Sequence, residues 1–433
     1  MIDHAVPLIR AVVLHPDRRS DSPRLASERL EEAAGLARAL DLDVRAEEIV
    51  RLRGTTPATL FGSGKVEELA ALVRAAEAEA VIVDDALTPV QQRNLEKAWE
   101  VKVIDRTGLI LEIFGRRART KEGRLQVELA RLDYERSRLV RTWTHLERQR
   151  GGTGSTGGPG ETQIELDRRL IADRIVRLKA ELEEVRRTRG LHRKQRQKVP
   201  FPTIALVGYT NAGKSTLFNR LTGSEVFAKD LLFATLDTTQ RTIRLPQGRP
   251  AIVADTVGFI SDLPHELVES FRATLEEVGE ADLILHVRDI ASTDSDAQAK
   301  DVEAVLKQIE TPEGKTRRVL EVWNKIDLLD DETREAVLGQ AERLAKEGEA
   351  VAVSAWTGEG IEPLRQAITG LIDDDPETQV TLAPHQGEAL AWLYEHGRVT
   401  TRDTDELGRT HVTVRLHPGA LGRFERLYPD LAG

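Results

Sequence analysis

The sequence predicts an α/β protein in which a doubly wound, mostly parallel sheet follows a first α/β domain and a long antiparallel helical hairpin, with a small α/β domain at the end. Three observations predict this arrangement. Short apolar runs alternate with helical patterns in the first 115 residues. Two apolar stripes then flank a glycine-rich stretch, and residues 208–215 form a glycine-rich turn between an apolar run and a helical pattern. The alternation of apolar runs with helical patterns is typical of βα units. We therefore expect domains at 1–115, 116–198, 199–375 and 376–433.

In the first domain the apolar runs predict strands at 11–14, 44–49, 81–83 and 101–104, and the helical spacing predicts helices at 23–40, 66–76 and 90–98. Within it, the segment Gly62-Ser63-Gly64-Lys65 invites a nucleotide-binding interpretation. It lacks the spacing and the following Ser or Thr of a phosphate loop, so a plain turn into a helix is favoured. The alternative is an ATP-driven RNA remodeller that uses this segment.

The sequence of residues 116–198 predicts a hairpin of two long helices. Apolar residues from Leu125 to Leu146 and from Ile164 to Val185 recur at steps of three, four and seven, which favours an antiparallel pair. Arms of about 28 residues would extend roughly 40 Å. After them, the polar and basic segment 191–198 precedes Pro200 and Pro202 and is interpreted as a hinge.

The tip and charge of the hairpin favour contact with RNA. Residues 151–160 contain six glycines, which permit close approach to another backbone. Residues 116–198 carry 23 Lys or Arg and 12 Asp or Glu, although the whole chain has a net charge of -10. Five arginines lie near the tip: Arg148, Arg150, Arg168, Arg169 and Arg174. A basic rod suits a crevice lined by phosphates, whereas solvated helix faces or a coiled-coil surface for a protein partner are the alternatives.

The third domain begins with a phosphate loop, whose predicted nucleotide contacts are Gly208, Tyr209, Thr210, Asn211, Ala212, Gly213, Lys214 and Ser215. Its glycines let successive backbone N–H groups face one anion at a helix N-terminus. Lys214 adds a positive charge for the terminal phosphates, and the Ser215 hydroxyl is placed to hold Mg²⁺. Because strand, turn and helix agree with the motif, a chance match is disfavoured.

Downstream motifs complete a guanine nucleotide site. The strand over 252–255 leads into Asp255, Thr256, Val257 and Gly258, where the carboxylate can hold Mg²⁺ through water and the Gly258 N–H can sense the last phosphate. Another strand leads into Asn324, Lys325, Ile326 and Asp327. The Asp327 carboxylate can accept two hydrogen bonds that guanine offers and adenine does not, so the motif selects GTP. Backbone N–H groups of Ser354, Ala355 and Trp356 can meet the base carbonyl.

This order of motifs resembles the TRAFAC class of GTPases, which implies a Ras-like doubly wound fold. The resemblance implies that Phe233, Ala234, Thr235, Leu236 and Asp237 belong to the first switch. A match to the Phe-x-Thr-Leu-Asp pattern assigns the second Mg²⁺-binding hydroxyl to Thr235, with Thr238 and Thr239 as alternatives. Asn211 resembles the residue that recruits K⁺ in some related GTPases.

The full combination, including the hairpin sequence Gly158 to Glu165, resembles the HflX family of ribosome-associated GTPases. This resemblance implies binding to the large ribosomal subunit and its rRNA, separation of stalled or idle ribosomes, and hydrolysis stimulated by the ribosome. Lys214, Thr235 and Gly258 are then the catalytic candidates. Phe259 stands where Ras has a water-orienting Gln, so slow intrinsic hydrolysis is expected. The alternative function is a GTPase switch whose hairpin docks a protein.

Composition limits the remaining choices. The chain has no cysteine, which excludes disulfides and thiolate metal sites, and no apolar run reaches the roughly 18 to 20 residues of a membrane span. We therefore expect a cytoplasmic protein, monomeric and with no DNA partner. Residues 376–433 show a helical pattern at 384–396 and an alternating strand at 412–416, but no chemical motif.

Overall fold

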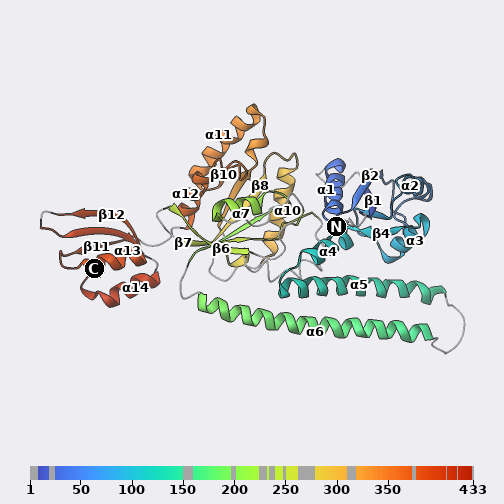
Figure 1. The fold of residues 1–433 in the computed structure, drawn as a ribbon, viewed down its shortest axis with the longest axis horizontal. Helices are drawn as coiled ribbons and strands as arrows, with labels where there is room; N and C mark the ends of the chain where they lie inside the picture. Colours follow the sequence, from blue (N-terminus) through green and yellow to red (C-terminus); the bar gives the residue numbers. More distant parts are fainter. Residues whose placement is uncertain are drawn as a thin grey trace, which may run out of the picture.

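The computed structural model describes residues 8–18, 25–149, 159–196, 201–223, 232–233, 239–246, 250–261, 278–309, 318–372, 377–405, 407–416 and 418–431. They form three sheets and a pair of long helices (Figure 1). The predicted mixed α/β fold is confirmed. In this described part of the chain, no helix is both long enough and apolar enough to cross a membrane.

The first sheet is fully parallel and has the order β2-β1-β3-β4. Its strands are β1 (Arg10–Asp17), β2 (Asp43–Arg51), β3 (Ala80–Val83) and β4 (Lys102–Asp105), and its helices are α1 (Ala26–Arg38), α2 (Ser63–Ala75), α3 (Pro89–Trp99) and α4 (Arg106–Arg117). The local sequence explains where α3 begins. Thr88 caps the helix through a capping box with Gln91, and Pro89 occupies the first helical position. The Gly62–Lys65 segment is the start of α2, where Lys65 Nζ pairs with Glu48 and Glu68 at 2.8 Å each.

The hairpin consists of α5 (Lys121–Gln149) and α6 (Pro159–Arg196). The two predicted stripes pack together through a core of Leu125, Leu129, Ile175, Leu178 and Leu182. The predicted hinge over 191–198 is wrong for most of its length, because α6 continues through Arg196. The segment is rich in Arg, Lys and Gln, which are good helix formers, and the first proline comes only at residue 200. The glycine-rich tip, 150–158, lies outside the described residues.

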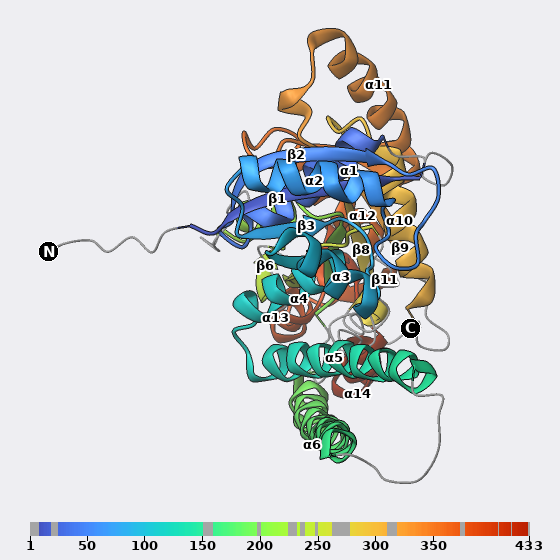
Figure 2. The same ribbon diagram turned by 90° about the vertical axis from the view of Figure 1, so that its right-hand side faces the viewer.

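One side of α5 is fixed to the first domain. It lies along α3 and α4, with α6 on its outer side (Figure 2). The buried Asp105 carboxylate accepts hydrogen bonds from Tyr134 Oη at 2.6 Å and from Arg138 Nη2 at 2.5 Å. The Arg138 guanidinium also stands over the Tyr134 ring at 4.0 Å. These contacts hold this part of the hairpin against the end of β4.

The central sheet has six strands in the order β10-β9-β8-β5-β7-β6, and only the β6–β7 pair is antiparallel. The strands are β5 (Thr203–Gly208), β6 (Thr239–Arg244), β7 (Pro250–Asp255), β8 (Leu283–Asp289), β9 (Arg318–Asn324) and β10 (Ala350–Ala352). The helices are α7 (Lys214–Thr222), α10 (Ser295–Gln308), the 3₁₀ helix η2 (Ile326–Leu328), α11 (Asp331–Glu347) and α12 (Ile361–Ile372). The carboxyl ends of β5, β7, β8 and β9 meet at one edge, the usual ligand position in such sheets.

The last sheet is antiparallel, with the order β11-β13-β12. It comprises β11 (Glu377–Leu382), β12 (Arg398–Thr404) and β13 (Thr410–Arg415), with α13 (Gly387–His396), α14 (Pro418–Leu427) and the 3₁₀ helix η3 (Pro429–Leu431). Its own core includes Val380, Leu393, Val412, Val414 and Phe424. This part of the chain therefore forms a separately packed α/β unit, as the helical and alternating patterns indicated.

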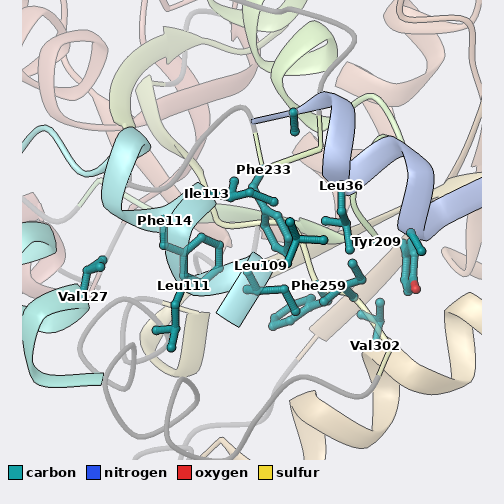
Figure 3. Packing of buried hydrophobic residues seen from close by; sticks show 14 of the residues in the cluster. Leu36, Leu109, Leu111, Ile113, Phe114, Val127, Tyr209, Phe233, Phe259 and Val302 are labelled. Carbon is teal, nitrogen blue, oxygen red and sulfur yellow. The ribbon is translucent and has the colours of Figure 1, made fainter. Parts of the chain in front are cut away.

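The first and central domains share one hydrophobic core (Figure 3). Helices α1 and α4 contribute Leu36, Leu109 and Phe114, and the central domain contributes Phe233 and Phe259. The Phe114 and Phe233 rings meet edge to face, with centroids 4.7 Å apart. Burial on so many sides also explains why the helical pattern of α4 escaped prediction. Its buried residues, Leu109, Ile110, Leu111, Ile113 and Phe114, form a short run that is apolar except for Glu112, and such a run does not by itself distinguish a buried helix from a strand.

Candidate nucleotide site

The turn between β5 and α7 requires glycine at two positions. Gly208 has φ +154°, and a Cβ there would lie 2.2 Å from the carbonyl oxygen of Val287 on β8. Gly213 has φ +91°, and a Cβ there would lie 2.2 Å from Asn324 Nδ2. A side chain at either position would collide with these atoms, so the tight turn between the strand and the helix requires glycine at both. These contacts also bring the turn against β9, where the predicted base-reading motif begins.

We expect Gly213→Ala to lower the free energy of unfolding by about 3 kcal/mol, because Ala is strained at positive φ and its methyl group would collide with the Asn324 amide. Gly223→Ala is the matched control, since Gly223 has φ +65° but nothing within 4 Å of a built Cβ. It should cost only about 1 kcal/mol. Urea unfolding measures both values, and equal losses would contradict the role of the Asn324 contact.

The Lys214 ammonium lies within the turn. Lys214 Nζ donates hydrogen bonds to the carbonyl oxygens of Gly208 at 3.0 Å and Tyr209 at 2.6 Å. An ammonium has three N–H donors, so these bonds fix its direction and leave a donor for an anion. Burial lowers the pKa of Lys214 to about 8, while the Asp255 carboxylate acts in the opposite direction. A bound phosphate would favour the charged form and raise this pKa again.

This pKa predicts how nucleotide affinity depends on pH. Below pH 8 Lys214 is charged in both the free and the bound protein, so the affinity for GDP should be flat. Above pH 8 the empty site loses the proton that binding must restore, so affinity should fall, by about tenfold between pH 7 and pH 9. Titration with a fluorescent GDP analogue measures this. GMP, which has the same base but no β-phosphate, is the control, and a parallel fall for GMP would contradict the assignment to Lys214.

The residues beside Lys214 fit a magnesium ion. Ser215 Oγ donates a hydrogen bond to Asp255 Oδ2 at 2.8 Å, and Asp255 is fully buried at the end of β7. Hydroxyl and carboxylate oxygens are the hard donors that Mg²⁺ prefers, together with phosphate oxygens. Within the described residues no group of three or more His, Asp or Glu side chains forms a metal site by itself. Ser215 and Asp255 are thus the described residues that would hold the ion beside the phosphates.

The segment after Asp255 lies directly on the turn. A Cβ built on Gly258 would lie 3.0 Å from Thr210 Cα and 3.1 Å from Lys214 Nζ. Two backbone hydrogen bonds fix this placement: Phe259 N donates to the Gly208 carbonyl at 3.1 Å, and Thr210 N donates to the Phe259 carbonyl at 2.7 Å. The Phe259 side chain is buried in the shared core. The structure therefore brings Gly258 next to Lys214, while the Phe259 side chain is held in apolar surroundings.

The segment predicted to read the base is held by Asn324. Its Nδ2 donates to the Ala212 carbonyl at 2.8 Å, and its Oδ1 accepts from the Ala355 N–H at 2.9 Å, so one side chain joins the three predicted loops. Lys325 has φ +69°, and its Nζ pairs with Asp289 at 2.6 Å. The Asp327 carboxylate is exposed and has no hydrogen-bond partner among the described residues. It is thus available to a ligand.

The loop after β10 forms the other wall. Ser354 is buried, and Arg220 on α7 donates to the carbonyl oxygens of Ala355, at 3.2 Å, and of Trp356. The Trp356 side chain is 78% exposed, which is unusual for a residue so close to a fixed loop. It therefore presents a free apolar surface close to the Asn324 loop.

The first-switch residues are only partly described. Phe233 packs on Phe114, whereas Ala234, Thr235, Leu236, Asp237 and the alternative Thr238 lie outside the described residues. Thr239 begins β6 and pairs with Asp255 in register. The predicted role of Thr235 stays a prediction.

A buried polar cluster behind the turn escaped prediction. Arg106 Nη2 donates to the Ser261 carbonyl at 3.0 Å and pairs with Glu32 at 2.5 Å. Tyr209 Oη donates to Glu32 and accepts from Ser261 N at 2.9 Å. The one available signal was the charged Arg106 at the end of an apolar strand, and it gave no indication of a partner 155 residues away.

Comparison with known proteins identifies the family of the chain. Family models match along the chain, described as GTP-binding GTPase N-terminal (residues 27–115), GTP-binding GTPase Middle Region (117–196), 50S ribosome-binding GTPase (203–325) and HflX C-terminal domain (339–428).

Among curated proteins, "GTPase HflX" of Magnetococcus marinus is 50% identical over 398 residues, covering 92% of this chain and 90% of that protein. The Escherichia coli protein of the same name is 46% identical, covering 83% of each. "Putative GTP-binding protein 6" of Xenopus laevis is 36% identical, covering 97% of this chain and 80% of that protein. Among solved structures, a GTP-binding protein from Sulfolobus solfataricus in complex with GDP is 25% identical with a TM-score of 0.45, covering 84% of this chain and 99% of that one.

Proposed function

Because the chain belongs to the HflX family of GTPases, we propose that it docks on the large ribosomal subunit and uses GTP to separate stalled or idle ribosomes in the cytoplasm. GTP hydrolysis itself follows from the family and its GTPase domain. The observation that carries the proposal is the joining of two parts in one chain. The candidate guanine nucleotide site belongs to the central domain, and a basic hairpin is packed on the neighbouring domain.

In the proposed site, the N–H groups of 208–215 and Lys214 hold the phosphates, and the Gly258 N–H meets the third phosphate. Asp327 reads the guanine, and the Asn324 contacts keep its loop in place. Ser215, with Thr235, would hold Mg²⁺, which when bound neutralises charge on the phosphate oxygens. Asn211, at φ +60°, is the candidate K⁺ residue. Equal hydrolysis rates in potassium and sodium buffers would remove that last assignment.

We propose that hydrolysis is slow until the ribosome completes the site. Phe259 occupies the place of a water-orienting Gln, and its side chain is buried among apolar residues where it can make no hydrogen bond to water. Single-turnover rates with and without ribosomes test this. A large stimulation is expected, and equal, fast rates would refute the proposal.

Contact with rRNA is supported by arginines on the described part of α6. Arg168 and Arg169 are exposed near the tip, whereas Arg174 pairs with Glu128 at 2.7 Å and is less available. Opposite charge attracts such residues to phosphates, and the attraction weakens as salt is raised.

Co-sedimentation with large subunits in sucrose gradients tests the docking step, with a non-hydrolysable GTP analogue and GDP in separate lanes. Arg168→Glu with Arg169→Glu should abolish binding, while Arg187→Glu, far along the same helix, should not. Absence of binding in the GTP-analogue lane would contradict the proposal. Binding that survives high salt and RNase treatment would instead favour a protein partner. Light scattering of intact ribosomes then measures subunit separation.

A further inference from the structure

The polar cluster behind the phosphate loop forms a continuous chain of contacts between two domains. On the first domain, His15 Nδ1 lies 2.9 Å from Asp84, and Arg106 bridges Asp84 and Glu32 at 2.5 Å each. On the central domain, Tyr209 belongs to the phosphate loop and Ser261 follows the Gly258 motif. Glu32 contacts both of these residues, and Arg106 contacts Ser261. These contacts therefore end on the two segments that we propose to meet the third phosphate of GTP.

These contacts are buried and mutually dependent. The side chains of Arg106, Glu32 and Asp84 are 4%, 8% and 1% exposed. Burial alone would lower the pKa of Arg106, but the Asp84 and Glu32 carboxylates outweigh it and raise that pKa. Burial likewise opposes the charge of Asp84, yet Arg106 and His15 bring its pKa down to about 2. Each charge is thus stabilised by its neighbours, and such buried groups are costly to displace.

The segment from Gly258 to Ser261 is held at both ends. At its start, Phe259 makes two backbone hydrogen bonds to the phosphate loop, and a Cβ on Gly258 would nearly touch Lys214. At its end, the Ser261 N–H donates to Tyr209 Oη, and the Ser261 carbonyl accepts from Arg106. Ile260, between them, is buried in the shared core. The position of the Gly258 N–H is therefore set partly by residues of the other domain.

We propose that Glu32 and Arg106 are positioning residues for GTP hydrolysis, which hold Ser261 and Tyr209 so that the Gly258 N–H stays on the phosphate loop where the third phosphate binds. The proposal rests on the proposed contact between Gly258 and that phosphate. GDP has no third phosphate, so in the proposed site it makes no contact with the Gly258 N–H. Loss of the cluster should therefore weaken binding of GTP much more than binding of GDP.

Two variants of the full-length protein separate this role from folding. Arg106→Lys keeps a positive charge beside Asp84 and Glu32, but one ammonium cannot reproduce the guanidinium fork that also reaches Ser261. Glu32→Gln removes the charge while keeping the size. The matched control is Glu47→Gln, because Glu47 forms an ion pair with Arg38 within the same domain and away from the cluster. Affinities for fluorescent GDP and a fluorescent non-hydrolysable GTP analogue are measured with single-turnover hydrolysis rates.

We expect both variants to weaken binding of the GTP analogue by about tenfold and to slow hydrolysis, with GDP affinity within about twofold of the parent and Glu47→Gln unchanged. Equal losses for both nucleotides would mean a merely structural role and would overturn the proposal, as would unchanged affinities or faster hydrolysis. If the parent protein itself binds neither nucleotide, the proposed nucleotide site is wrong. That result differs from an equal loss in the variants, which would refute only the positioning role of Glu32 and Arg106.

Discussion

Asp327→Asn is expected to reduce the affinity for GTP by about 100-fold or more and to create a preference for xanthosine triphosphate. The exposed Asp327 carboxylate can accept from the two N–H groups on the guanine edge, whereas the Asn amide presents a donor to one of them. Losing two charge-assisted hydrogen bonds accounts for a factor of this size. Xanthine carries an oxygen where guanine carries its exocyclic amine, so it can accept from the new amide.

Competition between the two triphosphates for a fluorescent nucleotide measures the switch. Asp331→Asn is the matched control, since Asp331 is an exposed carboxylate at the start of the next helix, α11. It should leave the preference for GTP intact. If Asp327→Asn still prefers GTP over xanthosine triphosphate, the base is read by another residue.

Lys214→Ala is expected to weaken GTP binding by about 100-fold and to slow single-turnover hydrolysis by about 10² to 10³. The two carbonyl oxygens that now orient Nζ would remain, but the positive charge facing the phosphates would be lost. Equilibrium titration and rapid-quench hydrolysis measure the two effects, and a circular dichroism melt checks that the variant is folded.

The control for this experiment is Lys65→Ala in the first domain. Lys65 is held by Glu48 and Glu68 at the start of α2, so its replacement should change neither the binding nor the hydrolysis of GTP. Nucleotide binding that survives Lys214→Ala but is lost in Lys65→Ala would move the site to the first domain. It would also revive the interpretation of the protein as an ATP-driven remodeller.

Much of the fold was predictable because its signals are local. The sequence signals for strand β5, the glycine turn and α7 lie next to one another in the chain. The apolar stripes of α5 and α6 follow from the helical spacing of their residues. Helix α4 was missed because its middle is a short, nearly continuous apolar run, which does not by itself distinguish a buried helix from a strand. The end of α6 was missed because a polar, basic segment is compatible with either a helix or a linker until a proline interrupts it.

The candidate site likewise has features that short sequence motifs predicted and features that only the folded structure shows. The residues of the turn and of the Asn324–Asp327 motif were predicted because each motif is short and continuous. Asn324 joins three loops, and Gly213 has room for no side chain, because the turn after β5 meets the end of β9 in the folded sheet. Neither contact can be seen in any one segment. The Arg106 cluster joins residues more than 150 positions apart, so no pattern along the chain could have indicated it.

The attachment of α5 has a mechanical consequence. Asp105 is bound to Tyr134 and Arg138 of the hairpin, and its sequence neighbour Arg106 is bound to Ser261 of the central domain. The residues that attach the hairpin and the Gly258–Ser261 segment to the first domain are thus consecutive, about 3.8 Å apart along the backbone. A displacement of α5 that keeps the Asp105 contacts would therefore act on the backbone next to Arg106. The hairpin and the Gly258–Ser261 segment are therefore attached to the first domain at adjacent positions at the end of β4.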